Sequence, residues 1–526
     1  MASIIINSLT FYYSAGASET IFENVNLNLS TDWKLGLIGR NGKGKTTLLK
    51  LIKKSLEPVN GSISTGVDTF YSPYIPVNSS KLTLEVIREN VAPFSQWERE
   101  MESLLNKGDE DSLRQYNRIL EQYQNHDGFK IDALIEKETH DIGIDTGLLT
   151  RDFRTLSGGE QTRALLVSLF LKKNAFLLID EPTNHLDMDG RGKLGEYLNN
   201  KKGFIIVSHD RYFLDLCTDH ILSINKSDIR INKGNYSQWK YNSDLETDFE
   251  KKKKEKLSRE VKSLEVAAKK RRKWANIKEN EIKGASDKGF VSHQSAKLMK
   301  RAIAIEDRIT GKIEKKMNLL KNYEKKRILK LRSKPGQGNL LAYMEDVYLS
   351  FNGKEILSNV SLYLREGSRI AITGRNGSGK TSLLKMLTGV LQPDKGDLFV
   401  KSGLDVSYVR QNPLWQKGYL KDLLYYHKID QTMFRNILAV FGARGDIFER
   451  PLETYSRGEI KKIELCRSFI RPYDLLIWDE PLNYIDIMSR EQIEEVALKN
   501  EPTMIFVEHD AAFIDNVATE IISLNK

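Results

Sequence analysis

The feature that most constrains the fold is a duplication of short motifs across the two halves of the chain. Residues 36–47 read GLIGRNGKGKTT, and residues 371–382 read AITGRNGSGKTS. Further along, LLIDEPTNHLD at 177–187 is matched by LIWDEPLNYID at 476–486. The spacing between the copies far exceeds the ~20 to 50 residues of a solenoid repeat. The sequence therefore predicts two copies of one whole domain.

The copies differ in length between these motifs. The glycine motifs start 335 residues apart, whereas the two Asp-Glu pairs lie 299 residues apart, so the first copy carries an insertion. A polar stretch of helical character places this insertion at about 92–137. We expect a first domain at 1–238, a charged linker at 239–336 and a second domain at 337–526.

Each copy places a glycine-rich loop between a short apolar strand and a helix, and both loops fit GxxxxGK[ST]. The backbone N–H groups of such a loop bind phosphates, its lysine reaches the outer phosphates, and its hydroxyl residue ligates Mg²⁺. Two matches in this context predict two nucleotide sites rather than chance loops. The candidate residues are Gly39, Asn41, Gly42, Gly44, Lys45, Thr46 and Thr47, with Gly374, Asn376, Gly377, Gly379, Lys380, Thr381 and Ser382 in the second copy.

An Asp-Glu pair ends an apolar strand in each copy. We expect Asp180 and Asp479 to hold Mg²⁺, directly or through water. Glu181 and Glu480 follow immediately and are candidate general bases that polarise an attacking water. A pair of surface acids at a strand end is the plain alternative, and the phosphate loop upstream in each copy argues against it.

LSGGEQ at 156–161, DEPTNHLD at 180–187 and SHDRYFLD at 208–215 resemble motifs of the ATP-binding-cassette ATPases, and the chain resembles their ABC-F subfamily along its whole length. The resemblance implies an α/β fold of two P-loop cassettes joined by a long antiparallel helical hairpin. It implies two ATP molecules with Mg²⁺, each between one copy's glycine loop and the other's signature. The residues it implicates are the switch histidines His209 and His509, the signature residues Ser157, Gly158, Gly159, Ser456 and Gly458, the adenine-stacking Tyr13 and Phe351, and the Q-loop Gln411, also a candidate Mg²⁺ ligand.

Tyr13 and Phe351 have an equally good interpretation as core aromatics, and this alternative stays open. Two departures from the family pattern affect one composite site. The second signature has Arg457 where the first copy has Gly158, so a side chain would crowd the approach to the phosphates. The first copy has Tyr74 where the second has Gln411. Both departures fall on the site that uses Lys45, so we expect two unequal sites.

The excess positive charge of the chain lies in its central segment. Residues 240–335 contain 30 Lys and Arg against 14 Asp and Glu, whereas the remainder contains 51 against 57. Such an asymmetry favours a polyanion as partner, nucleic acid first. Apolar residues at three- and four-residue steps predict two long helices around a turn near residues 284–289. The candidate RNA-binding residues are Lys269, Lys270, Arg271, Arg272, Lys273, Trp274, Phe290, Lys297, Lys300 and Arg301.

A solvated charged spacer is the alternative interpretation of this linker. In the ABC-F family the linker enters the tRNA exit site of the ribosome and points towards tRNA in the peptidyl site. The resemblance thus implies large-subunit rRNA and P-site tRNA as partners, and a monomer whose two cassettes pair with each other. The long linker and short insertion most resemble the antibiotic-resistance group, of the lincosamide, pleuromutilin and streptogramin A type.

The composition of the chain excludes several other classes of protein. No apolar run approaches the ~18 to 20 residues that span a bilayer, and we see no secretion signal, so a cytoplasmic protein without a membrane partner is expected. Two distant cysteines exclude a disulfide framework. A housekeeping factor for stalled ribosomes is one alternative function. The ATPase of a membrane importer is another, and it leaves the basic linker unexplained.

Overall fold

The structure is a computed structural model of the 526-residue chain. It describes residues 2–13, 20–76, 79–107, 109–184, 186–225, 228–281, 300, 304, 307–308, 338–443, 445–470 and 472–524. The chain forms two compact units. The first contains Met1–Ile224, Ile229–Tyr236 and Arg327–Lys526, and the second contains Asn225–Asp228 and Ser237–Lys326. Both copies of the duplicated motifs lie in the first unit.

The first copy contains two sheets. The antiparallel sheet has strand order β2-β1-β4, and the larger sheet has the order β5-β6-β7-β3-β8-β9. In the larger sheet β9 is antiparallel to β8, and the other pairs are parallel. The strands are β1 Ser3–Phe11, β2 Phe22–Ser30, β3 Lys34–Gly39, β4 Asn60–Thr65, β5 Asp68–Ser72, β6 Ala175–Asp180, β7 Phe204–Val207, β8 His220–Ile224 and β9 Ile229–Lys233.

The second copy repeats this topology. Its antiparallel sheet has the order β11-β10-β13 and its parallel sheet the order β14-β15-β16-β12-β17, which matches β5-β6-β7-β3-β8 position by position. The tandem duplication predicted from the motifs is therefore confirmed at the level of the sheets. The strands are β10 Leu340–Phe351, β11 Lys354–Arg365, β12 Arg369–Thr373, β13 Lys395–Val400, β14 Val406–Val409, β15 Leu475–Asp479, β16 Met504–Val507 and β17 Glu520–Ser523.

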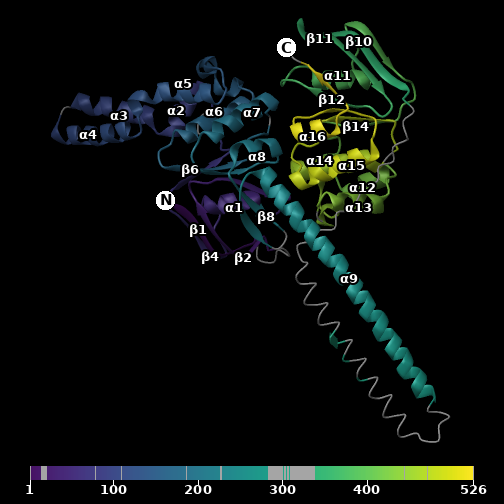
Figure 1. Cartoon of the computed structure of the whole chain (residues 1–526). Coiled ribbons are helices and arrows are strands. Elements are labelled where there is room, and N and C mark those ends of the chain that lie inside the picture. The colour runs from purple at the N-terminus through teal and green to yellow at the C-terminus, as the bar shows by residue number, and fades with distance from the viewer. Residues whose placement is uncertain are drawn as a thin grey trace. The chain divides into compact units, whose positions relative to one another are not determined.

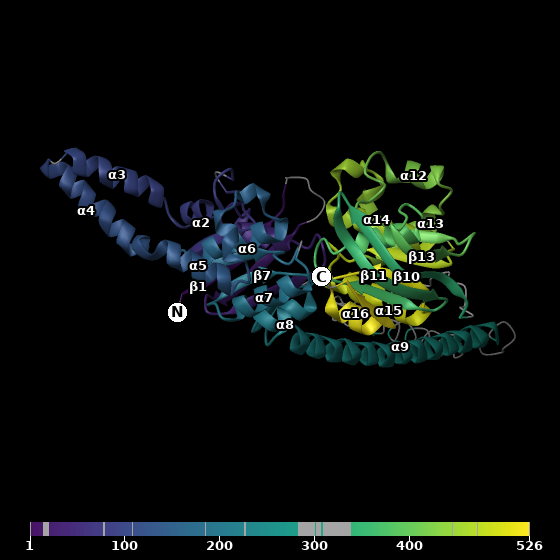
Figure 2. The same ribbon diagram turned by 90° about the horizontal axis from the view of Figure 1, so that it is seen from above.

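The helices follow the same duplication. In the first copy they are α1 Lys45–Ile52, α2 Thr83–Val91, α3 Phe94–Lys107, α4 Glu110–Asn125, α5 Ile131–Asp141, α6 Gly158–Phe170, α7 Met188–Asn199 and α8 Arg211–Cys217. In the second copy they are α11 Lys380–Leu387, α12 Leu420–Tyr426, α13 Gln431–Val440, α14 Arg457–Ile470, α15 Ile487–Asn500 and α16 Ala511–Val517. Helices α3 and α4 occupy the segment where the sequence predicts an insertion. They lie side by side and extend away from the sheets of the first copy (Figure 1 and Figure 2).

One helix of each copy packs between its two sheets. In the first copy, Leu48 and Leu49 of α1 are fully buried and share a core cluster with Ile4, Leu35 and Phe176 from both sheets. Helix α11 has the same place in the second copy. Strands covered on both faces have continuous apolar sequences, as in β6 and β15. Polar residues therefore lie in the loops that follow the carboxyl ends of the parallel strands. Ligands bind at these ends in open α/β sheets.

The linker helix α9 spans Tyr236–Glu281 and has 46 residues. At ~1.5 Å per residue such a helix is about 70 Å long. It begins three residues before the predicted linker boundary at 239. Residues 300, 304, 307 and 308 are also helical, whereas the predicted turn and most of the predicted second helix lie outside the described residues. The hairpin beyond α9 therefore stays a prediction.

Candidate active site

The two glycine loops have the backbone conformation that a phosphate loop requires. Gly44 and Gly379, directly before α1 and α11, have φ angles of 90° and 94°. A Cβ atom on Gly44 would lie 2.5 Å from Ile21 Cγ2. Only glycine fits these positions, because a side chain would be strained there and would also clash. The loops thus end at helix N-termini, which favour the binding of an anion.

The lysine of each loop is buried and folded back over its own loop. Lys45 and Lys380 are 8% and 6% exposed. Their Nζ atoms donate to Gly39 O and Gly374 O, at 2.8 Å in both copies. Burial lowers the pKa of Lys380 from its ordinary value, and nearby carboxylates oppose the shift. An ammonium group held at the mouth of the loop can neutralise phosphate charge.

A hydroxyl and a carboxylate meet beside each loop. Thr46 Oγ1 donates to Asp180 Oδ2 at 2.6 Å, and Thr381 Oγ1 donates to Asp479 Oδ2 at 3.0 Å. Asp479 Oδ1 is buried and has no hydrogen-bond partner among the described residues. A buried carboxylate oxygen without a donor, beside a hydroxyl, fits a hard cation such as Mg²⁺, which takes oxygen ligands.

The second copy surrounds its candidate base with donors. Glu480 Oε2 accepts from Asn483 Nδ2 at 2.6 Å and from Gln411 Nε2 at 3.2 Å. His509 Nε2 lies 3.7 Å from Glu480 Oε1. Burial alone would raise the pKa of Glu480, but His509, Gln411 and Lys380 lower it to about 2. This carboxylate is ionised at neutral pH and can accept a proton from water.

The first copy surrounds its glutamate differently. His209 Nε2 lies 3.1 Å from Glu181 Oε1. Burial, with a smaller contribution from Asp180, raises the pKa of Glu181 to about 8, although Lys45 opposes the shift. Glu181 and Glu480 both have left-handed backbones, with φ angles of 53° and 49°. The two glutamates thus share a backbone position but differ in environment.

One tyrosine, Tyr74, stands in the first copy where the second has the Q-loop glutamine. The register of the strands shows that Tyr74 is the counterpart of Gln411. Ser72 pairs with the residue before Asp180, and Val409 pairs with the residue before Asp479. Tyr74 and Gln411 each lie two residues after that pairing position. The Tyr74 hydroxyl does not contact Glu181 but shares a hydrogen bond of 2.6 Å with Ser168 Oγ. Tyr71, which sequence reasoning missed, donates instead to Asp180 Oδ2 at 2.9 Å.

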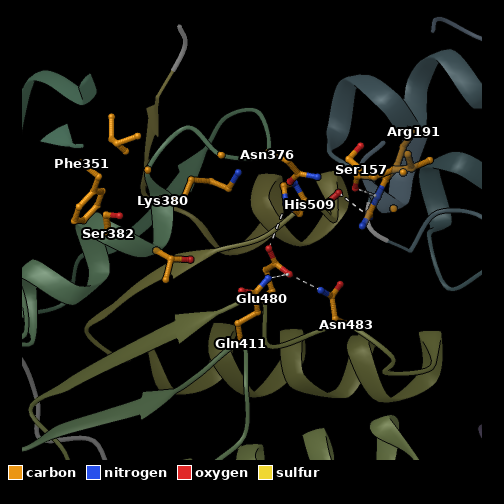
Figure 3. A pocket seen from close by; sticks show the side chains of 17 residues that line it. Ser157, Arg191, Phe351, Asn376, Lys380, Ser382, Gln411, Glu480, Asn483 and His509 are labelled. Carbon is orange, nitrogen blue, oxygen red and sulfur yellow. Dashed lines mark hydrogen bonds and ion pairs between the residues drawn. The ribbon is translucent and has the colours of Figure 1, made fainter. Parts of the chain in front are cut away.

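A cavity of about 560 Å³ joins the two copies (Figure 3). The first copy contributes residues of its signature and of α7. The second contributes its glycine loop and the side chains of Gln411, Glu480, Asn483 and His509. Its lining consists of Ser157, Gly158, Gly159, Leu186 and Arg191, with Phe351, Ile356, Asn376, Gly377, Gly379, Lys380, Thr381, Ser382, Gln411, Glu480, Asn483 and His509. We call this composite site the Lys380 site.

Reciprocal contacts define a second composite site, the Lys45 site. Asn376 N donates to Asp187 Oδ2 at 3.3 Å, and its counterpart Asn41 N donates to Asp486 Oδ2 at 3.4 Å. Each glycine loop therefore touches the aspartate that caps the helix after the other copy's Asp-Glu motif. The arrangement is head to tail, as the resemblance implies.

Arg457 of the second signature bonds to a tyrosine that contacts the first glycine loop. Its Nη1 donates to the Tyr484 hydroxyl at 3.1 Å, and its guanidinium lies 5.7 Å from the Tyr484 ring centroid. Tyr484 O in turn accepts from Asn41 Nδ2 at 2.8 Å. A Cβ atom on Gly458 would lie 3.2 Å from Asn41 Nδ2, so the second signature and the first glycine loop are in close contact. The Arg457 side chain is held by Tyr484 of its own copy. Ser456, just before it, accepts a hydrogen bond from Glu459 N.

The two predicted adenine-stacking aromatics are partly exposed. Phe351 is 44% exposed and lines the cavity of the Lys380 site. Tyr13 is 62% exposed, and its hydroxyl shares a hydrogen bond of 2.9 Å with Thr47 Oγ1. Neither ring is enclosed in a core, although Tyr13 packs edge-on against Phe11. Stacking on adenine therefore stays a prediction for each.

Of the predicted linker residues, Lys270, Lys273 and Lys300 are exposed. Lys269, Arg271, Arg272 and Trp274 lie on the backbone of α9, and their side chains are outside the description. Phe290, Lys297 and Arg301 lie outside the described residues altogether.

Sequence reasoning missed three groups that the tertiary structure brings to the sites. Asp187 and Asp486 contact the opposite glycine loops, and their repetition in DEPTNHLD and DEPLNYID was the signal that could have found them. Arg191 lines the Lys380 site without any motif of its own. Tyr71 was hidden because its partner, Asp180, lies more than a hundred residues away.

Comparison with known proteins agrees with this geometry. The family model for the ABC transporter matches residues 22–184 and 357–483, more than half of the chain. The chain belongs to this family. The two copies are therefore ATP-binding cassettes, and the protein is a Mg²⁺-dependent ATPase of the ABC-F type.

Relatives match almost the whole length of the two cassettes. The putative ATP-binding protein YdiF of Bacillus subtilis is 28% identical over 100% of this chain and 80% of its own. ABC transporter F family member 5 of Arabidopsis thaliana is 26% identical over 96% of this chain and 73% of its own. The energy-dependent translational throttle protein EttA of Mycobacterium tuberculosis is 25% identical over 97% of this chain and 89% of its own.

A solved structure shares the fold of the tandem cassettes. It is the complex of the archaeal ribosomal stalk protein aP1 and the archaeal ribosome recycling factor aABCE1, with a TM-score of 0.58 and 18% identity over 98% of this chain and 87% of that one. In the part of this chain that the structure describes, no helix has the length and apolar character needed to cross a bilayer.

Proposed function

We propose that this ATPase is a ribosome-binding factor of the cytoplasm that enters the tRNA exit site and protects the peptidyl-transferase region from antibiotics. The observation that carries the proposal is the insertion of a long basic helix between two cassettes that face each other head to tail. A net charge of +16 over residues 240–335 suits rRNA and tRNA backbones. The relative named a translational throttle supports a role in translation.

In the proposed mechanism the Lys380 site carries most of the hydrolysis. Lys380 and the N–H groups of its loop bind the phosphates, and the first cassette's Ser157 contacts them from the opposite side. Thr381 and Asp479 would hold Mg²⁺, and the ion would offset the phosphate charge when bound. Glu480 accepts the proton of the attacking water, oriented by His509. The 3.7 Å separation of His509 and Glu480 leaves them close enough to act on the same water.

The Lys45 site is proposed to bind ATP and to turn it over slowly. Tyr74 stands where the Lys380 site has Gln411, and its hydroxyl bonds to Ser168 rather than to Glu181. The Tyr71 hydroxyl occupies Asp180 Oδ2, which Thr46 also uses. Arg457 adds a bulky side chain to the second signature. Compared with the Lys380 site, the Lys45 site therefore lacks the glutamine beside its glutamate, has a tyrosine hydroxyl bonded to its aspartate and faces a signature with a larger side chain.

The test combines two measurements on the full chain. A Glu181→Gln, Glu480→Gln variant, trapped with ATP, should co-sediment with ribosomes, whereas a Lys45→Ala, Lys380→Ala variant should not. A drug-sensitive host that expresses the wild-type chain should tolerate lincosamides, pleuromutilins or streptogramin A. Binding to ribosomes without any tolerance would reject drug protection and favour a housekeeping role, which the likeness to EttA also suits. Co-sedimentation with membranes instead would reject both.

A further inference from the structure

Arg211 forms an ion pair from the first cassette to the second. It is the first residue of α8, two positions after His209. Its Nη2 donates to Glu494 Oε2 at 2.8 Å and to Asp510 Oδ1 at 3.3 Å. The side chains are 12%, 12% and 2% exposed respectively. Charges so poorly solvated interact more strongly than exposed pairs do.

The group that Arg211 holds is next to the switch histidine of the Lys380 site. Asp510 follows His509 and caps α16, because its Oδ1 accepts from Phe513 N at 3.0 Å. Its Oδ2 accepts from Arg490 Nη1 at 3.0 Å. The Asp510 carboxylate therefore accepts hydrogen bonds from Arg211 of the first cassette and Arg490 of the second. These bonds fix the position of the His509–Asp510 backbone.

Arg191 holds the same segment from the first cassette. Its Nη1 donates to His509 O at 3.0 Å (Figure 3). The same Nη1 donates to Asp210 Oδ2 at 2.8 Å. It is 8% exposed. Two arginines of one cassette thus contact consecutive residues of the other, on the chain segment that carries His509.

The link is not reciprocated. The position that corresponds to Arg211 in the second cassette is Ala511, which has no side-chain donor. Arg490 corresponds to Arg191, but its hydrogen bonds go to Ile485 O and Asp510 Oδ2 of its own cassette. Among the described residues, first-cassette side chains therefore donate to His509 O and to Asp510, whereas no side chain of the second cassette donates to His209 or Asp210.

We infer that Arg211 is a positioning residue for hydrolysis at the Lys380 site. It acts through Asp510 to keep His509 facing Glu480, and it makes turnover there depend on contact with the first cassette. The inference rests on the proposed roles of Glu480 and His509. Displacements of ~1 Å at a reacting group can cost a hundredfold in rate, so a remote ion pair is enough to control the step.

The test measures ATP turnover by the full chain in two backgrounds. With Glu181→Gln, which leaves the Lys380 site active, Arg211→Ala should lower kcat about tenfold. KM for ATP should change less than about twofold, since the phosphate-binding groups are untouched. In the Glu480→Gln background only the Lys45 site can still hydrolyse ATP. There Arg211→Ala should change the residual kcat less than about twofold.

Two further variants sharpen the result. Arg211→Lys keeps the charge but not the planar fork, and should recover part of kcat. Arg114→Ala removes an exposed ion pair with Glu110 on α4, with side chains 69% and 83% exposed, and should leave turnover unchanged. If Arg211→Ala does not fold, Glu494→Gln provides the same comparison and should lower kcat in the Glu181→Gln background alone.

Equal losses in both backgrounds would identify Arg211 as a general anchor of the interface and overturn the inference. So would an unchanged kcat in the Glu181→Gln background. If Glu480→Gln by itself leaves turnover at the wild-type rate, the proposed roles of Glu480 and His509 fail, and the inference fails with them. If Glu480→Gln stops turnover but Arg211→Ala does not affect it, only the inference fails.

Discussion

Replacing Glu480 by glutamine removes one negative charge from the Lys380 site and keeps the shape of the side chain. Asn483 and Gln411 both donate to Oε2, at 2.6 and 3.2 Å, and a glutamine oxygen in that place can accept the same two bonds. The substituted side chain should therefore stay in position. Lys380 and its loop are not altered, so ATP binding should survive.

The rate of hydrolysis should fall sharply. The wild-type carboxylate is ionised, since His509, Gln411 and Lys380 outweigh burial and lower the pKa of Glu480 to about 2. An amide cannot accept the proton of water, and loss of a general base costs ~10² to 10⁴ in rate. That loss corresponds to about 2.7 to 5.5 kcal/mol in the activation free energy.

The matched control is Glu181→Gln at the Lys45 site. If this site turns ATP over slowly, as proposed, turnover should fall less than about threefold. Phosphate release at saturating ATP measures both variants, and binding of a fluorescent ATP analogue checks occupancy. Equal losses from the two single substitutions would refute the assignment of unequal sites. Wild-type turnover by the doubly substituted chain would refute the role of both glutamates.

Four further predictions follow from other parts of the chain. Asp479→Asn should raise the Mg²⁺ concentration needed for half-maximal turnover, and an unchanged Mg²⁺ titration would contradict its role as a ligand. Replacing the five basic residues at 269–273 by alanine should release the trapped chain from ribosomes at lower salt, as co-sedimentation would show. Shortening 283–291, or Phe290→Ala, should reduce drug tolerance while ATP binding persists; full tolerance after shortening would make this segment a spacer. Phe506→Ala should lower the free energy of unfolding by about 3 to 5 kcal/mol in denaturant titrations, because the side chain is fully buried.

Local chemistry could be predicted from the sequence because it depends on neighbours along the chain. A glycine loop between an apolar strand and a helix has only a few residues in which to form, so GRNGKGKT and GRNGSGKT already predict phosphate sites. The strand-ending Asp-Glu pairs are equally local. The order of strands in the two large sheets matches the duplication that the motifs predict. The charge of the linker needed no structure at all, since charge is a sum over residues.

What the sequence could not determine depends on partners that are far apart in the chain. Tyr71 reaches Asp180 while Tyr74 turns to Ser168, and no spacing distinguishes the two tyrosines. Arg211 meets Glu494 across 283 residues, so neither periodicity nor a motif announces the pair. Such contacts form only when separate sheets and helices are packed together, and a charged side chain is buried only where that packing supplies its counter-charge. The sequence by itself determined which groups can bind ATP, and the tertiary structure alone decided which side chains outside the motifs, such as Arg211 and Tyr71, contact them.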